Sequence, residues 1–158
     1  MGLFSFLKGS GAKLLSKKEE EAVKTASPQE ALNIKKTAML KAVTDLNLPV
    51  QNLSLDINDE TVTVWGQAET QMAKELTVLT LGNNTGISSV DDRMSVIATN
   101  AEPEAVFYEV KSGDTLSKIA KAQYGNASKY NIIFEANKPM LKDPDKIYPG
   151  QVLRIPQL

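Results

Sequence analysis

The sequence predicts an α+β protein built from two small domains. Apolar residues recur at helical spacing and in alternation, and over residues 28–98 this pattern runs helix–strand–strand–helix–strand. A second pattern, strand–helix–helix–strand, covers residues 106–158, and a short polar stretch with one proline, residues 99–105, separates the two. A chain of 158 residues is long enough for two units of this size. The first unit should form a small sheet with helices on one face.

The region before the first domain, residues 1–27, divides into an amphipathic segment and a charged stretch. Leucines and phenylalanines lie among the first residues and are interrupted by Gly9-Ser10-Gly11, where glycine would break a helix or allow close backbone approach. The following run, Lys17-Lys18-Glu19-Glu20-Glu21, is typical of a solvated helical face or a linker.

The first domain should begin with a helix. Ser27 is a typical N-cap, Pro28 suits the first helical position, and Glu30 lies three residues after the cap. The helix should end at Asn47-Leu48-Pro49, because the residue before a proline disfavours helical torsions. The apolar residues near one helical stripe are Ala31, Ile34, Ala38, Val43 and Leu46.

A hairpin, a second helix and a third strand should follow. Apolar and polar residues alternate on both sides of Asn58-Asp59-Glu60, which indicates a hairpin with one buried face. The second helix starts after Gly66, and Gly82 is its expected C-cap. The residues that these patterns bury are Leu53, Leu55, Ile57, Val62, Val64, Met72, Leu76, Leu79, Val90, Met94 and Val96.

The second domain should begin with an extended segment over residues 107–110. Asp114 or Thr115 would cap the helix that follows, and Tyr124-Gly125-Asn126 would end it. A second helix is expected over residues 128–137, and a final strand after the turn at Tyr148-Pro149-Gly150.

The composition excludes several classes of function. The chain has no cysteine and no histidine, which excludes disulfides, thiol catalysis, histidine-based catalysis and histidine-ligated zinc. The formal net charge of −1 gives no field that attracts nucleic acid. No apolar run approaches the roughly 18 residues that span a bilayer, and the start lacks a signal-peptide pattern. We therefore expect a cytoplasmic, monomeric protein that is not an enzyme, binds no nucleic acid and does not insert stably into membranes.

Two sequence motifs near the C-terminus belong to one pattern. Residues 110–116 read VKSGDTL and residues 147–156 read IYPGQVLRIP, and at this separation they resemble a LysM domain. The resemblance implies binding of N-acetylglucosamine polymers in a shallow groove between two loops. The groove residues would be Gly113, Asp114, Thr115, Leu116, Ala136, Asn137, Lys138 and Pro139. Helix capping by Asp114 and Thr115 explains part of the same pattern.

The first domain carries a second pair of sequence motifs. Residues 61–66 read TVTVWG and residues 86–92 read GISSVDD. They resemble the BON domain, in which a strand ends in glycine, a helix follows, and a similar sequence leads into the last strand. The likeness covers residues 30–98. BON domains occur in periplasmic, membrane-associated and cytoplasmic bacterial proteins, so association with a membrane or a partner is one function that it implies.

The loop over residues 81–87 is the candidate ion site. Glycines at positions 82 and 86 permit left-handed torsions that turn successive carbonyls inward. The loop has no lysine and no phosphate-loop pattern, and carbonyl oxygens suit a large, weakly hydrated monovalent cation. A helix C-cap followed by an ordinary loop explains the same residues. The adjacent carboxylates of Asp91 and Asp92 would point to opposite faces of a strand and form no ion site.

The order of all these parts is similar to a family of small bacterial potassium-binding proteins, in which a BON domain precedes a LysM domain. The resemblance implies a cytoplasmic protein that binds K⁺, becomes compact when it does so, and acts as a sensor or buffer of this ion. We place K⁺ against the backbone carbonyls of Leu7, Ser10, Gly82, Asn84 and Ile87. Two alternatives stay open, namely glycan binding by the LysM groove and membrane or partner association through the BON domain.

Overall fold

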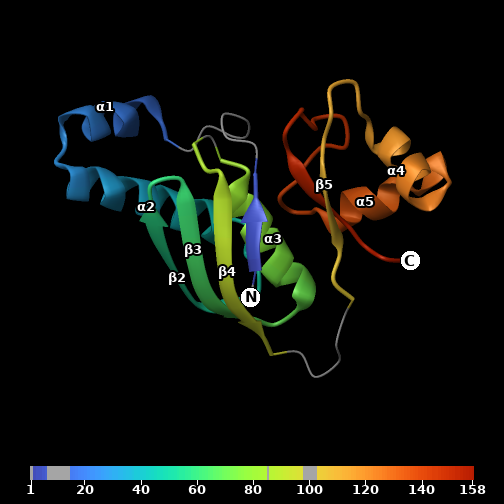
Figure 1. The fold of residues 1–158 in the computed structure, drawn as a ribbon, viewed down its shortest axis with the longest axis horizontal. Helices are drawn as coiled ribbons and strands as arrows, with labels where there is room; N and C mark the ends of the chain where they lie inside the picture. Colours follow the sequence, from blue (N-terminus) through green and yellow to red (C-terminus); the bar gives the residue numbers. More distant parts are fainter. Residues whose placement is uncertain (1, 7–14, 85, 98–102) are drawn as a thin grey trace.

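The computed structural model describes residues 2–6, 15–84, 86–97 and 103–158 (Figure 1). They form an N-terminal module around a four-stranded sheet with strand order β1-β4-β3-β2 and a C-terminal module around a two-stranded sheet, β5-β6. The α+β class expected from the sequence is confirmed. Figure 1 shows the C-terminal module packed beside α3 and β1 of the N-terminal module.

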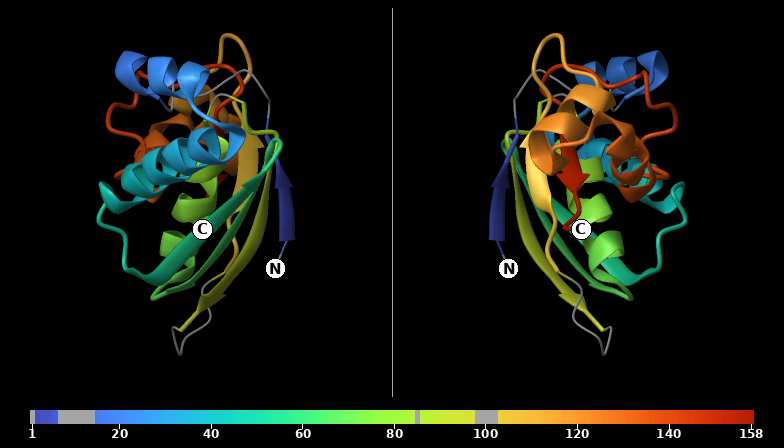
Figure 2. Two further views of the ribbon diagram at one scale, coloured as in Figure 1. Left: turned by 90° about the vertical axis from the view of Figure 1, so that its left-hand side faces the viewer. Right: turned by 90° about the vertical axis from the view of Figure 1, so that its right-hand side faces the viewer.

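The N-terminal module has the expected order of helices and strands. Antiparallel β2 and β3 form the predicted hairpin, and α3 connects β3 to the parallel strand β4. Figure 2 shows α1, α2 and α3 on one side of the sheet, while its other side is open. The element bounds are α1 Lys17–Thr25, α2 Pro28–Thr44, β2 Val50–Asn58, β3 Thr61–Ala68, α3 Gln71–Gly82 and β4 Ser89–Val96.

The start of the chain adds a strand that the sequence did not predict. Residues Gly2–Ser5 form β1, which pairs antiparallel with β4 at the edge of the sheet. Leu3 is 68% exposed, whereas Phe4 packs against the core and Phe6 is only 8% exposed. This alternation is that of a strand, but it is too short to be separated from an amphipathic helix by periodicity alone.

Several helix caps follow the sequence, whereas α2 ends at Thr44, before the expected Asn47-Leu48-Pro49, and the cap of α3 also differs. Ser27 caps α2 by accepting a hydrogen bond from the Glu30 amide, as predicted. The charged stretch forms α1, which begins with a capping box at Ser16 and buries none of its residues. The expected C-cap of α3 is wrong, because Gly82 is the last helical residue and Asn83 is the cap.

The C-terminal module has the expected strand–helix–helix–strand order. Its elements are β5 Val106–Glu109, α4 Leu116–Tyr124, α5 Tyr130–Ala136 and β6 Val152–Ile155. Thr115 is the N-cap of α4, and Gly125 ends it with a left-handed φ of 75°. The helix predicted over residues 128–137 begins as a short 3₁₀ turn, Ala127–Lys129, before α5.

The two modules share part of their hydrophobic core. Val152, Phe107 and Met140 of the C-terminal module pack against the core of the N-terminal module. The ring centroids of Phe4 and Phe107 lie 5.0 Å apart, within the range of favourable aromatic pairs. The second core belongs to the C-terminal module alone. The position of one module on the other is therefore set by apolar contact as well as by the chain connection.

Candidate functional site

The start of the chain meets the candidate loop at Phe6. The Phe6 amide donates a hydrogen bond of 2.8 Å to the Ser88 carbonyl. The Phe6 ring lies on Gly82 so closely that a Cβ there would be 2.1 Å from the nearest ring atom. The two segments that the sequence assigned to one ion site are thus in contact. Leu7 and Ser10, the two predicted ligands from the first segment, lie outside the described residues.

The two glycines of the loop serve different purposes. Gly86 has a φ of +92°, which is the left-handed torsion expected from the sequence. Gly82 is helical, and the expectation of a left-handed torsion there is wrong. Position 82 requires glycine because the Phe6 ring occupies the space of a side chain. The ring contact joins residues far apart in sequence, so periodicity and turn chemistry could not reveal it.

The C-terminal end of α3 presents carbonyl oxygens. The Asn84 side chain donates to the carbonyls of Thr80 and Leu81 at 2.8 and 2.9 Å, and the Ile87 amide donates to the Asn84 carbonyl at 3.2 Å. The last turn of α3 has no basic residue. No basic residue of α3 itself therefore compensates the negative end of the helix dipole.

Gly82, Asn84 and Ile87 are all buried at this end of the helix. Backbone oxygens at a helix C-terminus are known ligands for monovalent cations. Within the described ranges, no group of three or more acidic side chains is arranged to hold a metal ion. The chemistry that this place offers is coordination by neutral oxygens, which suits a large monovalent cation better than a divalent one.

Asn83 connects the same loop to the C-terminal module. Its side-chain amide donates to the Val152 carbonyl at 2.9 Å, and its side-chain oxygen accepts from the Val152 amide at 2.9 Å. Asn137 makes the same pair of bonds with the backbone of Arg154, at 2.9 and 2.8 Å. One asparagine from each module thus satisfies the edge of β6 that β5 leaves free. Local sequence patterns could not reveal the role of Asn83, because its partner lies 69 residues away.

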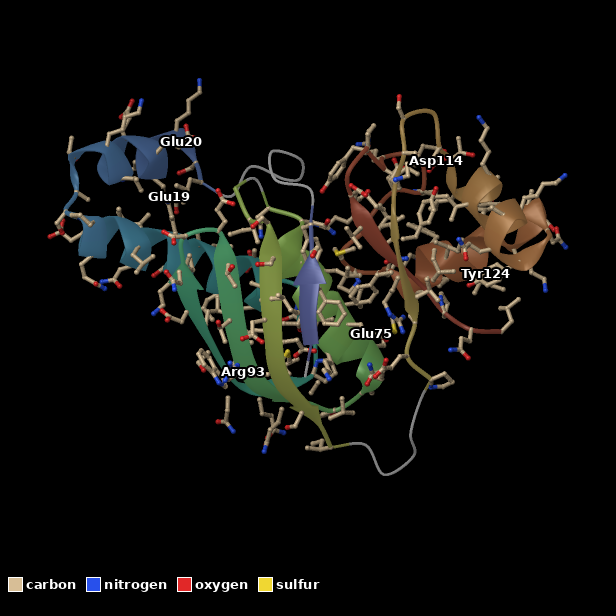
Figure 3. The ribbon with its side chains drawn as sticks, viewed as in Figure 1. Glu19, Glu20, Glu75, Arg93, Asp114 and Tyr124 are labelled. Atoms are coloured by element: carbon tan, nitrogen blue, oxygen red, sulfur yellow. The ribbon has the colours of Figure 1, made fainter. Side chains whose placement is uncertain are left out.

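A buried ion pair forms a second connection. Arg154 Nη2 donates to Glu75 Oε1 at 3.2 Å, and both side chains are only 5–6% exposed. The Ala105 amide donates to Glu75 Oε2 at 3.1 Å, so one carboxylate holds both β6 and the segment before β5. Burial raises the pKa of Glu75 above its ordinary value, and Arg154 opposes this rise. Figure 3 labels Glu75 on α3, next to β5.

Most polar groups of the predicted glycan groove have partners inside the protein. Asp114 accepts from the Tyr108 hydroxyl at 2.6 Å and from the Lys111 amide at 2.8 Å, and Thr115 caps α4. These hydrogen bonds lower the pKa of Asp114 and raise that of Tyr108 to about 12. Leu116, Ala136 and Asn137 are buried, and the exposed members of the set are Gly113, Thr115, Lys138 and Pro139.

Comparison with known proteins shows the family of the chain and one of its domains. The family model of the LysM domain matches residues 108–156. The chain is also 49% identical to the potassium binding protein Kbp of Escherichia coli O6:H1 over 163 residues, which cover 99% of both chains. The chain belongs to the Kbp family. The prediction of this family from the sequence motifs is thereby confirmed.

A more distant relative shares only part of the chain. An uncharacterized protein of Deinococcus radiodurans is 40% identical over 80 residues, which are 45% of this chain and 31% of that protein. The likeness of the N-terminal module to BON domains is supported by the kinship with Kbp and by the order of its elements. None of the helices in the described parts of the chain has the length and apolar character that a bilayer span requires.

Proposed function

We propose that this protein binds one K⁺ ion at the C-terminal end of α3. The observation that carries the proposal is a helix end that presents carbonyls, lacks a basic residue and has the start of the chain fixed on it through Phe6. The sequence similarity to a protein named for potassium binding supports the proposal. The carbonyls of Gly82, Asn84 and Ile87 would take one side of the ion, and those of Leu7 and Ser10 the other.

The bound ion would make the protein more compact. It would neutralise the negative end of the helix dipole and hold the first segment of the chain against the loop. Asn83 lies between two of the proposed ligands and is bonded to Val152, so ordering of the loop also favours docking of the C-terminal module. The protein would then act as a sensor or buffer of K⁺ in the cytoplasm, by binding and without catalysis.

Thermal unfolding in matched salts tests this proposal. The unfolding of the full chain, followed by the fluorescence of Trp65, is compared in potassium, sodium and choline chloride at equal ionic strength. Ligand linkage predicts about 2.7 kcal/mol of added stability when K⁺ is about a hundredfold above its dissociation constant. A midpoint that rises in potassium alone is the expected result. Identical midpoints in the three salts would contradict potassium binding.

A second candidate function is glycan binding by the C-terminal module. The match of the LysM family model to residues 108–156 favours it, and four groove residues stay exposed. A pull-down of the full chain on insoluble peptidoglycan tests it, with Lys138→Glu and Gly113→Trp as variants in the groove. Retention of the wild type and loss of both variants would support glycan binding. An equal amount of protein in the supernatant with and without peptidoglycan would rule it out.

A further inference from the structure

The N-terminal end of α3 lines a cavity of its own, far along the helix from the potassium site. The cavity has a volume of about 200 Å³ and lies where β1, α3, β4 and the segment before β5 meet. Pockets for drug-sized ligands measure about 300–1,000 Å³, so this one suits a smaller molecule. The residues that give it its chemistry are Phe4, Gln71, Lys74, Asp92, Glu104 and Phe107.

One wall of the cavity consists of hydrogen-bond donors with spare capacity. Lys74 has a side chain that is 15% exposed, and its one ion pair in the described chain joins Nζ to Asp92 Oδ2 at 3.4 Å. An ammonium group has three donors, and a charge-assisted hydrogen bond measures about 2.7–2.9 Å, so the ion pair with Asp92 uses little of this capacity. Gln71 precedes Lys74 by three residues, so both side chains lie on one face of the first turns of α3.

This wall favours a carboxylate. The first turn of a helix carries the positive end of the dipole, and Gln71 is the first residue of α3. Two carboxylates near the wall are already neutralised, since Asp92 pairs with Lys74 and Glu75 pairs with Arg154. Asp92 also accepts from the Met94 amide at 2.9 Å, which fixes it in place.

The other lining residues favour a cationic and an apolar group. Glu104 contributes a carboxylate without an ion pair to another described residue. Counting Arg154 with its partner Glu75, the charged groups around the cavity sum to −1, so a net anion is disfavoured. The rings of Phe4 and Phe107 supply an apolar surface beside these groups.

We propose that this cavity binds a small zwitterion, an α-amino acid with an apolar side chain. Its carboxylate lies at Gln71 and Lys74, its ammonium group at Glu104, and its side chain against Phe4 and Phe107. Because Phe4 belongs to β1 and Phe107 to β5, the bound amino acid contacts both modules and stabilises their docking. The inference does not rest on the proposed potassium site, since its described ligands Gly82, Asn84 and Ile87 do not line this cavity.

Calorimetric titration of the full chain with L-leucine tests the proposal, at one fixed potassium concentration. Two further probes each remove one charge: N-acetyl-L-leucine lacks the ammonium group and L-leucinamide lacks the carboxylate. Binding of leucine with at least tenfold weaker binding of both blocked forms is the expected result. No heat of binding for leucine, or equal binding of the three probes, would overturn the proposal.

Variants identify the cavity as the site. Gln71→Leu keeps the Lys74–Asp92 ion pair and should weaken leucine binding about tenfold, the factor that corresponds to 1.4 kcal/mol. Lys74→Met should weaken it further, although it leaves Asp92 buried without its partner. Lys35→Met, on the exposed side of α2, is the matched control and should bind leucine like the wild type. If the Gln71→Leu variant and the Lys74→Met variant both bind leucine as tightly as the wild type, the ligand lies elsewhere and the assignment is refuted.

Discussion

The side chain of Asn83 and the backbone of Val152 exchange two hydrogen bonds across the boundary between the modules, each 2.9 Å long. The side-chain amide of asparagine has the same donor and acceptor as a peptide group, so Asn83 takes the place of one residue of a neighbouring strand. It is also the C-cap of α3, next to the proposed ligands Gly82 and Asn84. Asn83 therefore links the loop directly to β6.

Replacement of Asn83 by alanine should separate potassium binding from compaction. The variant leaves the amide and carbonyl of Val152 without partners in a buried place, at a cost of about 2–4 kcal/mol. Chemical denaturation measures this cost, and small-angle scattering with and without KCl measures the change in radius of gyration. Asn83→Ala should lose most of the potassium-dependent compaction. An undiminished compaction would show that Asn83 does not couple the modules.

The contact between Phe6 and Gly82 should appear as strong non-additivity. Gly82→Ala places a methyl group where the Phe6 ring lies and should expel the ring, and Phe6→Ala removes the ring at a cost of about 3 kcal/mol. The double variant should cost little more than Phe6→Ala alone, because the alanine at position 82 then has space. Unfolding free energies of the four proteins, with and without KCl, check this. Additive costs would contradict the contact.

The order of the elements was accessible from the sequence because it depends on local signals. Ser27 and Thr115 cap helices, and Gly125 ends one, by rules that act within a few residues. β1 escaped prediction because four residues carry too little periodicity to distinguish a strand. Gly82 is not the cap of α3, and its need for glycine comes instead from the Phe6 ring, which packs on it from a distant part of the chain.

In the candidate site, too, the local features were predicted and the contacts between distant residues were not. The loop around Gly86 was predicted because a left-handed torsion is a local property of glycine. The hydrogen bonds of Asn83 and Asn137 to β6 and the Glu75–Arg154 ion pair were not predicted, since each depends on a partner that only the folded chain brings close. A polar residue with a distant partner looks like any surface residue in the sequence. Local chemistry thus predicts where a chain turns, and only the tertiary structure shows what its side chains bind.

The hydrogen bond from the Tyr108 hydroxyl to Asp114 should make the free energy of unfolding depend on pH in the acid range. The Tyr108 hydroxyl and the Lys111 amide lower the pKa of Asp114 below its ordinary value of 3.8. A carboxyl group whose pKa is lowered by folding stabilises the protein at pH values above its pKa in the unfolded chain. This contribution to the free energy of unfolding is lost as the pH falls through the pKa in the folded chain. Tyr108→Phe should therefore be less stable than the wild type near neutral pH, and the difference should shrink below about pH 3.8.

Tyr124→Phe is the control for this pH dependence. The Tyr124 hydroxyl donates to the Pro156 carbonyl, which does not titrate, so the cost of its removal should stay constant through the same acid range. Unfolding free energies of the three proteins between neutral pH and about pH 3 provide the comparison. A cost of Tyr108→Phe that is equally constant would mean that the hydroxyl does not stabilise the Asp114 carboxylate.

The ion pair Glu75–Arg154 should stabilise the docking of the modules only as a pair. Glu75→Leu leaves a buried guanidinium and Arg154→Met leaves a buried carboxylate, and each should cost about 3–5 kcal/mol.

The double variant should cost less than either single one, because two apolar side chains then meet in the interface. Lys41→Met breaks the exposed pair Lys41–Asp45 and serves as control, and it should change stability little. Denaturant unfolding of the four variants measures these costs. If the costs of the two single variants simply add in the double variant, Glu75 and Arg154 act independently, and the modules must be held together by Asn83 and the apolar contacts around Phe107.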